Sequence, residues 1–481
     1  MQVSLPISAA VNPSPARAAA AGSLLGANAP SIALPLTFTL TGLLALCSGM
    51  VWLVLQPSIL AGYHYNQYVI AATHLFVLGW ICSVVMGAMY QLVPVALETK
   101  LYSERLARWQ FAFHLVGFVG MVWMFRVWNM KQVGHFGCVL GVGVGLFVYN
   151  MARTLWRVPR WNVTATAVSA TLAWICLAIL SGLSVAAAKC AYDSTSSATG
   201  AVGVLLGGLR SIAGFLARFN PISTMHAHAH LGGVGFFTML IVGVSYKLIP
   251  MFTLSEVQSR RRAICSITLL NAGLAGSFVT ILLRSPLKLA FALMVVSALA
   301  VYSWEISAIL RARKRRALDW GIKYFLTAIM LLLPLSVLAV VLSWPGLPLN
   351  TFTGQLENLY GFLGFIGVIT LAIIGMLYKI IPFLVWFGRY SRQIGRAQVP
   401  SLADLYSARL QALGYWAYLA GLTGTCAAIL LSNETEVRIG CGFMALGVTT
   451  LSLNVGKMLA HFFKPTLKPF TLPTSTTAKI A

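Results

Sequence analysis

Long apolar stretches separated by short polar loops dominate the 481 residues of the chain. Every backbone polar group in the core of a bilayer must be satisfied internally, so apolar runs of about 20 residues predict membrane-spanning helices. Twelve such runs are present, at approximately 33–55, 65–94, 107–128, 133–155, 163–189, 222–250, 263–283, 287–310, 320–343, 356–386, 409–431 and 437–462. We therefore predict an all-α integral membrane protein with twelve transmembrane helices.

Three stretches are expected to lie outside this bundle. Residues 201–217 are apolar but short, rich in glycine and interrupted by Arg210, so we expect an interfacial segment in an outer loop. Residues 1–32 are rich in Ala, Ser and Pro and lack the compact charged and apolar regions of a signal peptide, which predicts a disordered cytoplasmic tail. Residues 464–481 form a second cytoplasmic tail, so the membrane domain is expected to cover 33–463.

Composition and charge support this interpretation. The chain is 58% hydrophobic and only 9% charged, which excludes a soluble enzyme of this size. The net charge of +24 is assigned to membrane topology and not to nucleic acid, because Lys and Arg concentrate in the loops after even-numbered helices. That asymmetry predicts a multi-pass protein of a bacterial-type inner membrane, in contact with the lipid bilayer and with both termini cytoplasmic. The eight cysteines include no C-x-x-C pair and no C-x-x-C-H haem attachment site.

One sequence frame occurs three times, in the second, sixth and tenth predicted helices. The windows are 74–94, 230–250 and 362–382, and they share two glycines, a tyrosine and a closing proline at the same positions. The shared residues are Gly79, Gly87, Tyr90 and Pro94 in the first window, Gly235, Gly243, Tyr246 and Pro250 in the second, and Gly367, Gly375, Tyr378 and Pro382 in the third. One repeat is therefore four helices, and three repeats form three pseudo-symmetric four-helix arcs.

The two glycines of each window lie on one helical face. Such a face permits close approach of a neighbouring helix, and it also accommodates a flat ligand. Both interpretations stay open from the sequence. If the ligand is flat, Gly79 and Gly235 are its candidate contacts.

Histidines gather at the outer ends of the second and sixth helices. His226, His228 and His230 lie within five residues inside an apolar span, and ionisable groups at such depth are usually functional. His226 and His230 share a helical face as an i, i+4 pair suited to copper, zinc or iron, whereas His228 points roughly the other way. We predict all three as metal ligands and His228 and His230 also as cofactor ligands. His74 occupies the same repeat position as His230 and is predicted to bind the cofactor too.

The remaining ionisable groups are weaker candidates. His114 in the third helix is expected to be structural, and His64, His135 and His461 to be interfacial. Glu305 and Glu357 lie near helix ends, where a solvated or salt-bridged carboxylate is expected. The third repeat has no histidine in its frame and carries Asn358, Tyr360 and Phe362 instead, so it is predicted to have no ligand histidine.

At this point the residues resemble a family, subunit I of the haem-copper oxidase superfamily, particularly its cbb-type and nitric-oxide-reductase branches. The sixth helix of cbb-type oxidases carries the frame of His230, Gly243, Tyr246 and Pro250. The second helix of the reductase branch carries a histidine with a similar glycine, tyrosine and proline ending, which resembles the window that starts at His74. The resemblance covers roughly residues 33–462. It implies that His74 is an axial haem ligand and that His230 falls at a copper-ligand position.

The departures from the family are equally informative. The family has a histidine pair at the start of helix seven, where this chain has Arg260 to Cys265, and a His-x-His on helix ten, where it has Tyr360 to Phe362. Four of the six family histidines are therefore missing, and a conventional oxygen-reducing haem-copper centre is not expected. The motif MHAHAHLGG is also similar to the NnrS family, membrane haem and copper proteins linked to nitric-oxide stress.

The leading hypothesis is a redox-type membrane protein that holds haem b, with copper as a second cofactor, near the outer face, in nitric-oxide or oxygen chemistry. His74 would be one axial ligand, and His226, His228 and His230 would supply a second ligand, a metal site or both. If the protein is an enzyme, the resemblance implies an oxidoreductase. The alternatives are a non-enzymatic NnrS-like protein, a secondary transporter, and a structural subunit that anchors a cytochrome c or a periplasmic copper protein.

Overall fold

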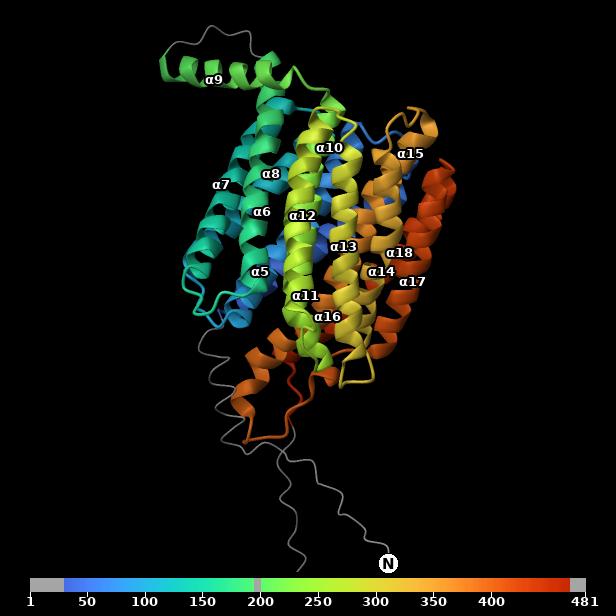
Figure 1. Cartoon of the computed structure of the whole chain (residues 1–481). Coiled ribbons are helices and arrows are strands. Elements are labelled where there is room, and N and C mark those ends of the chain that lie inside the picture. Colours follow the sequence, from blue (N-terminus) through green and yellow to red (C-terminus); the bar gives the residue numbers. More distant parts are fainter. Residues whose placement is uncertain (1–29, 194–199, 468–481) are drawn as a thin grey trace, which may run out of the picture.

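The computed structural model describes residues 30–193 and 200–467, and within these ranges the regular structure is entirely helical (Figure 1). The predicted tails 1–32 and 464–481 therefore lie almost wholly outside the described residues. The elements are α2 (Ala33–Leu55), α3 (Ser58–Ala61), α4 (Gln67–His74), η1 (Leu75–Cys82), α5 (Ser83–Ala96), α6 (Glu104–Arg126), α7 (Met130–Leu155), α8 (Val163–Asp193), α9 (Gly200–Leu216), α10 (Pro221–His230), η2 (Leu231–Thr238), α11 (Met239–Thr253), α12 (Arg260–Leu282), α13 (Lys288–Arg311), α14 (Trp320–Ser343), α15 (Thr351–Phe362), η3 (Leu363–Ile369), α16 (Thr370–Tyr390), η4 (Ser391–Gln393), η5 (Leu402–Leu405), α17 (Ala408–Leu430) and α18 (Glu434–Phe463).

The prediction of an all-helical membrane protein is confirmed. Of the described residues, 11 helices are long and apolar enough to cross a membrane. The predicted span that is not among these 11 is the third, 107–128, which corresponds to α6; this helix runs along the bundle beside α7 but begins with the charged residues Glu104, Arg105 and Arg108. The exact count of twelve spans thus stays a prediction, although each expected span has a helix of the structure in its place.

The segment predicted to be interfacial forms α9. This helix lies across the end of the bundle instead of running along it (Figure 1), and it is not among the apolar spans. Its orientation is that expected of a helix in the plane of a membrane surface. It shares this end of the molecule with the first turns of α10 and α15, whereas α5, α11 and α16 reach the opposite end.

The helices form a ring of three arcs around three inner helices. Successive helices pack side by side along the chain, and α18 closes the ring against α2. Each of the three predicted repeat windows lies on one inner helix. Part of each of these helices is wound as a π-helical segment, at η1, η2 or η3. In the most apolar part of these helices 61%, 67% and 83% of residues are buried, against 22% to 50% in the other candidate spans. The three repeat helices therefore line the centre of the bundle.

A second threefold feature joins the outer helices of each arc. Ser103, Ser259 and Ser407 cap the starts of α6, α12 and α17, and each of these serines donates its backbone N–H to a polar side chain on the following helix. The acceptors are Asn150 at 3.0 Å, Glu305 at 2.9 Å and Asn454 at 2.8 Å, which lie 46 or 47 residues further along the chain. Buried polar groups must be paired, and in every arc the serine N–H at the start of the first outer helix is paired by a side chain of the second.

Candidate haem and metal cavity

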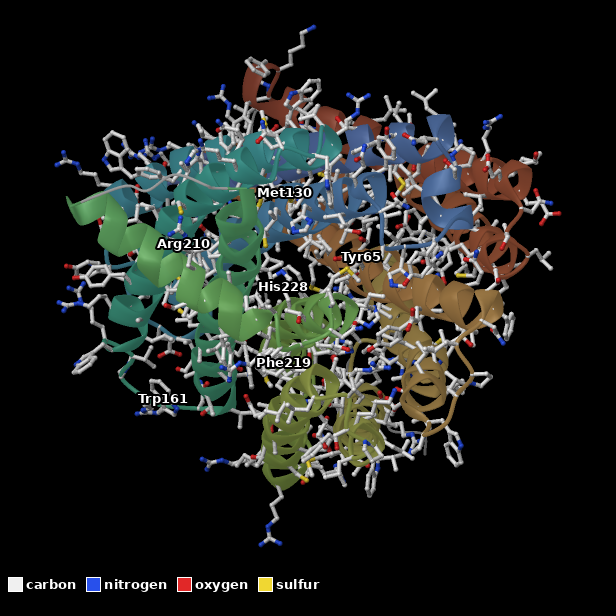
Figure 2. All side chains as sticks on the ribbon, turned by 90° about the horizontal axis from the view of Figure 1, so that it is seen from above. Tyr65, Met130, Trp161, Arg210, Phe219 and His228 are labelled. Atoms are coloured by element: carbon white, nitrogen blue, oxygen red, sulfur yellow. The ribbon has the colours of Figure 1, made fainter. Side chains whose placement is uncertain are left out.

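A cavity of about 1550 Å³ lies inside the bundle at the end where α10 and α15 begin. Six of the eight histidines line it, namely His64, His74, His114, His226, His228 and His230. Seen from the end where α9 lies, His228 is near the middle of the ring (Figure 2). The cavity exceeds the roughly 300–1,000 Å³ of ordinary small-molecule sites. Its walls are mainly apolar, and the imidazoles are joined there by a few other polar side chains, among them Glu357, Arg284 and Lys288.

His74 and His230 hold the same position in two repeats and have the same hydrogen bond. Nδ1 of His74 donates to the Ile70 carbonyl at 2.7 Å, and Nδ1 of His230 donates to the His226 carbonyl at 2.7 Å. A carbonyl can only accept, so the proton of each neutral ring is on Nδ1 and the lone pair is on Nε2. Ligating histidines are usually fixed in this way through their second nitrogen. Both residues are immediately followed by a π-helical segment.

The free nitrogens of these two rings have different surroundings. Nε2 of His230 faces the Tyr360 hydroxyl at 3.3 Å, and the two rings stack with centroids 5.8 Å apart. The His74 ring lies against Phe125 with centroids 4.5 Å apart, and none of the described residues bonds to its Nε2. His74 therefore presents an available lone pair, whereas that of His230 is engaged by a tyrosine.

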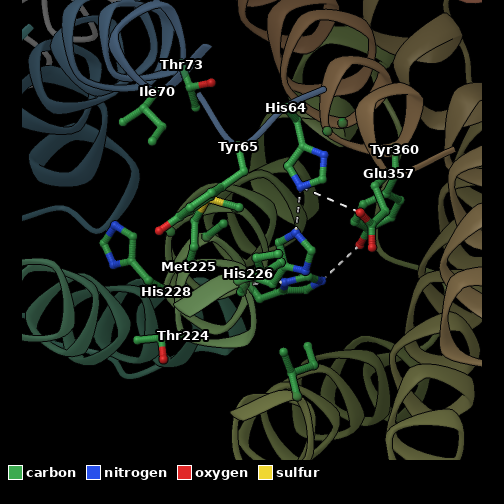
Figure 3. Close-up of a pocket in the computed structure, with 18 of the residues that line it drawn as sticks. His64, Tyr65, Ile70, Thr73, Thr224, Met225, His226, His228, Glu357 and Tyr360 are labelled. Atoms are coloured by element: carbon green, nitrogen blue, oxygen red, sulfur yellow. Dashed lines mark hydrogen bonds and ion pairs between the residues drawn. The ribbon is translucent and has the colours of Figure 1, made fainter. Parts of the chain in front are cut away.

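His226, His228 and His230 do not converge as a set. His226 and His230 face α15, whereas His228 points to the other side of α10, against Gly182 of α8 (Figure 3). Nδ1 of His228 is buried and has no hydrogen-bond partner among the described residues. As predicted, His226 and His230 share one face of the helix and His228 points away from them. The predicted cofactor ligand His228 is therefore separated from the other two histidines.

His226 instead meets two residues from other parts of the chain. Its Nε2 lies 3.2 Å from Nε2 of His64, and the carboxylate of Glu357 lies 3.6 Å from the same atom of His64. The two imidazoles stack at a centroid distance of 5.4 Å. Figure 3 shows the three side chains pointing toward one another. Among the described residues, these are the one set of three or more His, Cys, Asp or Glu ligand atoms that lie within 4.8 Å of one another.

The loop that carries His64 is held in place from both sides. Asn358 donates to the Gly62 carbonyl at 2.6 Å, and Gln355 donates to the Ala61 carbonyl at 2.8 Å. On the other side, the Asn66 side chain caps the first turn of α4. Burial lowers the pKa of His64, and the Asn358 side chain opposes that shift. Burial thus favours the neutral form of this imidazole.

The other ionisable residues have structural surroundings. Nε2 of the buried His114 contacts the Ser83 hydroxyl at 3.0 Å. His461 contacts the Tyr390 hydroxyl at 2.8 Å at the opposite end of the bundle, and His135 lies at the start of α7 beside Gln132. Glu305 is salt-bridged, which is one of the two predicted states: it is fully buried and accepts from Arg262 at 2.6 Å.

The repeat glycines lie at helix interfaces. A Cβ on Gly79 would meet Ala45 and Phe118, and a Cβ on Gly235 would meet Trp174 and Leu274. These glycines do not line the cavity. The structure therefore places them as the helix-packing interpretation expects, and the contacts observed do not support the alternative of a flat ligand on the same face.

Sequence reasoning missed two members of the cavity cluster. His64 was expected to be interfacial because it lies close to the outer interface, and Glu357 to be solvated or salt-bridged, which agrees with its contact to His64 but does not foresee the shared cluster. The available signal was that both lie just before or within the outer turn of a repeat helix, as His226 does. Tyr360 was noted only as a departure from the histidine frame, although it contacts His230.

The comparisons with known proteins agree with this architecture. The family model described as "Cytochrome C and Quinol oxidase polypeptide I" matches residues 19–130. A solved structure of a heme-copper terminal oxidase dimer matches with a TM-score of 0.62 over 89% of this chain and 84% of that chain, at 10% sequence identity. No curated protein matches the sequence.

These findings confirm the predicted resemblance to haem-copper oxidase subunit I. At 10% identity the structural match concerns the fold alone, and the family model covers mainly the first arc. The chain therefore has the helical architecture of haem-copper oxidase subunit I in a divergent form.

Proposed function

We propose that this membrane protein binds haem b in the histidine-lined cavity near the outer face and takes part in redox, nitric-oxide or oxygen chemistry. The observation that carries the proposal is the concentration of six histidines around one large apolar cavity. These histidines gather where the three arcs meet, in a fold similar to that of a heme-copper terminal oxidase.

The residues present fit a haem. A haem needs an apolar cavity of sufficient size and at least one imidazole with a free lone pair. His74 meets the second requirement, because its Nδ1 is held by the Ile70 carbonyl and its Nε2 is available to the cavity. Arg284 and Lys288 also line the cavity, and they supply the positive charges that haem carboxylates require.

His228 is the residue that would hold the haem together with His74. It lines the same cavity as His74, and its Nδ1 is buried without a partner. A buried nitrogen without a partner is costly unless a ligand occupies it or fixes the tautomer of the ring. His230 is a weaker candidate, because the Tyr360 hydroxyl already engages its Nε2.

Bound haem would supply one-electron transfer or binding of a diatomic ligand, with properties set by its axial ligands and its burial. The chain's own residues would hold the iron, exclude lipid and water, and place the Tyr360 hydroxyl beside His230 at the cavity wall. If the protein is an enzyme, it is an oxidoreductase. A cytochrome c or a periplasmic copper protein is the corresponding partner at the outer face.

Absorption spectroscopy of the full-length protein purified in detergent tests the proposal. We expect Soret and α bands after reduction with dithionite, and a b-type pyridine haemochrome. His74→Ala and His228→Ala should each lower the haem content several-fold without preventing membrane insertion, because one imidazole is lost from an otherwise intact apolar helix.

The matched control is His135→Ala, which removes an exposed histidine outside the cavity and should retain haem. A purified wild-type protein without haem bands would contradict the proposal. An unchanged haem content in both cavity variants would show that neither His74 nor His228 is an axial ligand.

A further inference from the structure

Three ligand-type side chains converge at the mouth of the cavity, and each comes from a different repeat. His64 precedes the inner helix of the first arc, His226 lies in the first turns of the second, and Glu357 lies in the first turns of the third. The outer ends of the three inner helices meet here, so the threefold arrangement itself brings the donors together. The third repeat, which has no histidine in its frame, contributes a carboxylate.

The distances suit coordination of one ion. Zinc–nitrogen bonds are about 2.0–2.1 Å long, so two nitrogen ligands in a tetrahedral site lie roughly 3.3 Å apart. The Nε2 atoms of His64 and His226 are 3.2 Å apart, and the Glu357 carboxylate lies 3.6 Å from His64. The ligand atoms of His64, His226 and Glu357 all lie within 4.8 Å of one another.

The cluster is also built in advance of binding. Asn358 and Gln355 fasten the His64 loop to α15, the helix that carries Glu357. Preorganised ligands lose little conformational freedom on binding, which is the usual mark of a site and not of an incidental contact.

A competing cation for Glu357 lies nearby. Lys288 lies at the cavity mouth and interacts with Glu357 electrostatically, but the two form no direct ion pair among the described residues, and Nζ of Lys288 donates to the Leu342 carbonyl at 3.1 Å. The Nε2 atoms of His64 and His226 face each other at 3.2 Å, and the Glu357 carboxylate lies beside them. A cation between these three groups would bind both nitrogens and the carboxylate together.

We propose that His64, His226 and Glu357 form a mononuclear site for a divalent first-row transition metal. Two imidazoles and one carboxylate form the ligand set of catalytic zinc sites and of non-haem iron(II) sites, which keep further coordination positions open. The cavity borders the cluster, so a ligand from the cavity could fill such a position. This proposal goes beyond the haem function and stands without it.

Metal titration of the full-length protein tests the site. The protein is purified in detergent, stripped with a chelator and titrated with Co²⁺, whose d–d absorption reports a protein-bound ion, and with Zn²⁺ by calorimetry. Wild type should bind one ion per chain. Glu357→Gln, which keeps the size of the side chain, and His64→Ala should each weaken binding by at least about 100-fold, because ligand loss exceeds the 10–100-fold effect of losing a supporting group.

Two controls separate this site from the haem site and from nonspecific loss. His461→Ala removes a histidine at the opposite end of the bundle and should bind Co²⁺ as wild type does. Haem content should be retained in Glu357→Gln, whereas His74→Ala should lose haem and keep the metal. Absence of stoichiometric binding in wild type, wild-type affinity in both ligand variants, or an equal loss in His461→Ala would overturn the proposal.

Discussion

At the scale of single residues, the helix backbone selects which nitrogen of a histidine is free. The carbonyl four residues earlier lies beside the ring and accepts from Nδ1, as it does for both His74 and His230 at 2.7 Å. Nε2, the nitrogen farther from the backbone, is then directed into the cavity. His74 and His230 are therefore each held in the tautomer whose Nε2 carries the lone pair.

Asn358 is a positioning residue for the loop that carries His64, and this role can be tested. Its amide donates to the Gly62 carbonyl at 2.6 Å and so fixes the loop that carries His64. We expect Asn358→Leu to weaken Co²⁺ binding at the His64 site by about 10–100-fold, because the loop loses its anchor while all three ligands remain. Haem content should not change.

The control for this variant is Asn271→Leu, which makes the same change at α12. Asn271 accepts from Trp174 at 2.7 Å, far along the chain from the His64 loop. An equal loss of Co²⁺ affinity in both variants would mean that Asn358 acts only through the general stability of the bundle.

At the scale of secondary structure, the three inner helices share a π-helical segment at one position. Leu75–Cys82, Leu231–Thr238 and Leu363–Ile369 follow directly after the first residue of each repeat window. Hydroxyl groups close these segments, since Thr238 and Thr370 each donate to the carbonyl five residues earlier at 2.8 Å. π-helical turns are frequent at functional sites. Here they separate the outer part of each helix, which lies at the cavity, from its packed inner part.

The packed part depends on glycines that admit a neighbouring helix. A Cβ on Gly243 of α11 would overlap the Cβ of Ala167 on α8, whereas a Cβ on Gly145 of α7 would meet nothing within 4 Å. We expect Gly243→Ala to lower the free energy of unfolding by about 1–3 kcal/mol, the usual effect of overpacking a core. Thermal unfolding in detergent measures the change as a lower midpoint.

Gly145→Ala is the matched control for this prediction. The same methyl group enters open space, and alanine favours a helix more than glycine does, so the midpoint should stay unchanged or rise. Equal midpoints in the two variants would show that the α8–α11 contact does not limit stability.

At the scale of the whole molecule, apolar periodicity predicted the architecture closely. The predicted span 222–250 corresponds to Pro221–Thr253, and the glycine, tyrosine and proline frame identified the three inner helices. The metal cluster was not predictable in the same way. His64 lies in a loop without periodicity, and its partner His226 is 162 residues away, so only the closure of the ring brings them together. The π-helical segments likewise have no signature in apolar pattern.

The distribution of Lys and Arg also predicts which side of the membrane the cavity faces. Lys and Arg predict that the loop after α16 is cytoplasmic and that the loop after α14, at the cavity mouth, is outside. Leu349 is 84% exposed and lines the cavity, and Leu402 is 43% exposed in the opposite loop. In intact cells a membrane-impermeant maleimide should therefore label Leu349→Cys and not Leu402→Cys.

Both variants should be labelled after permeabilisation, and the parent chain measures the background from its own cysteines. Labelling of Leu402→Cys alone in intact cells would place the cavity on the cytoplasmic side. It would also move the proposed metal and haem ligands away from any periplasmic electron donor. The helices that carry His226 and Glu357 both begin at the end of the bundle that bears Leu349. The labelled side of Leu349→Cys is therefore the compartment from which metal ions and electron donors would reach the cavity.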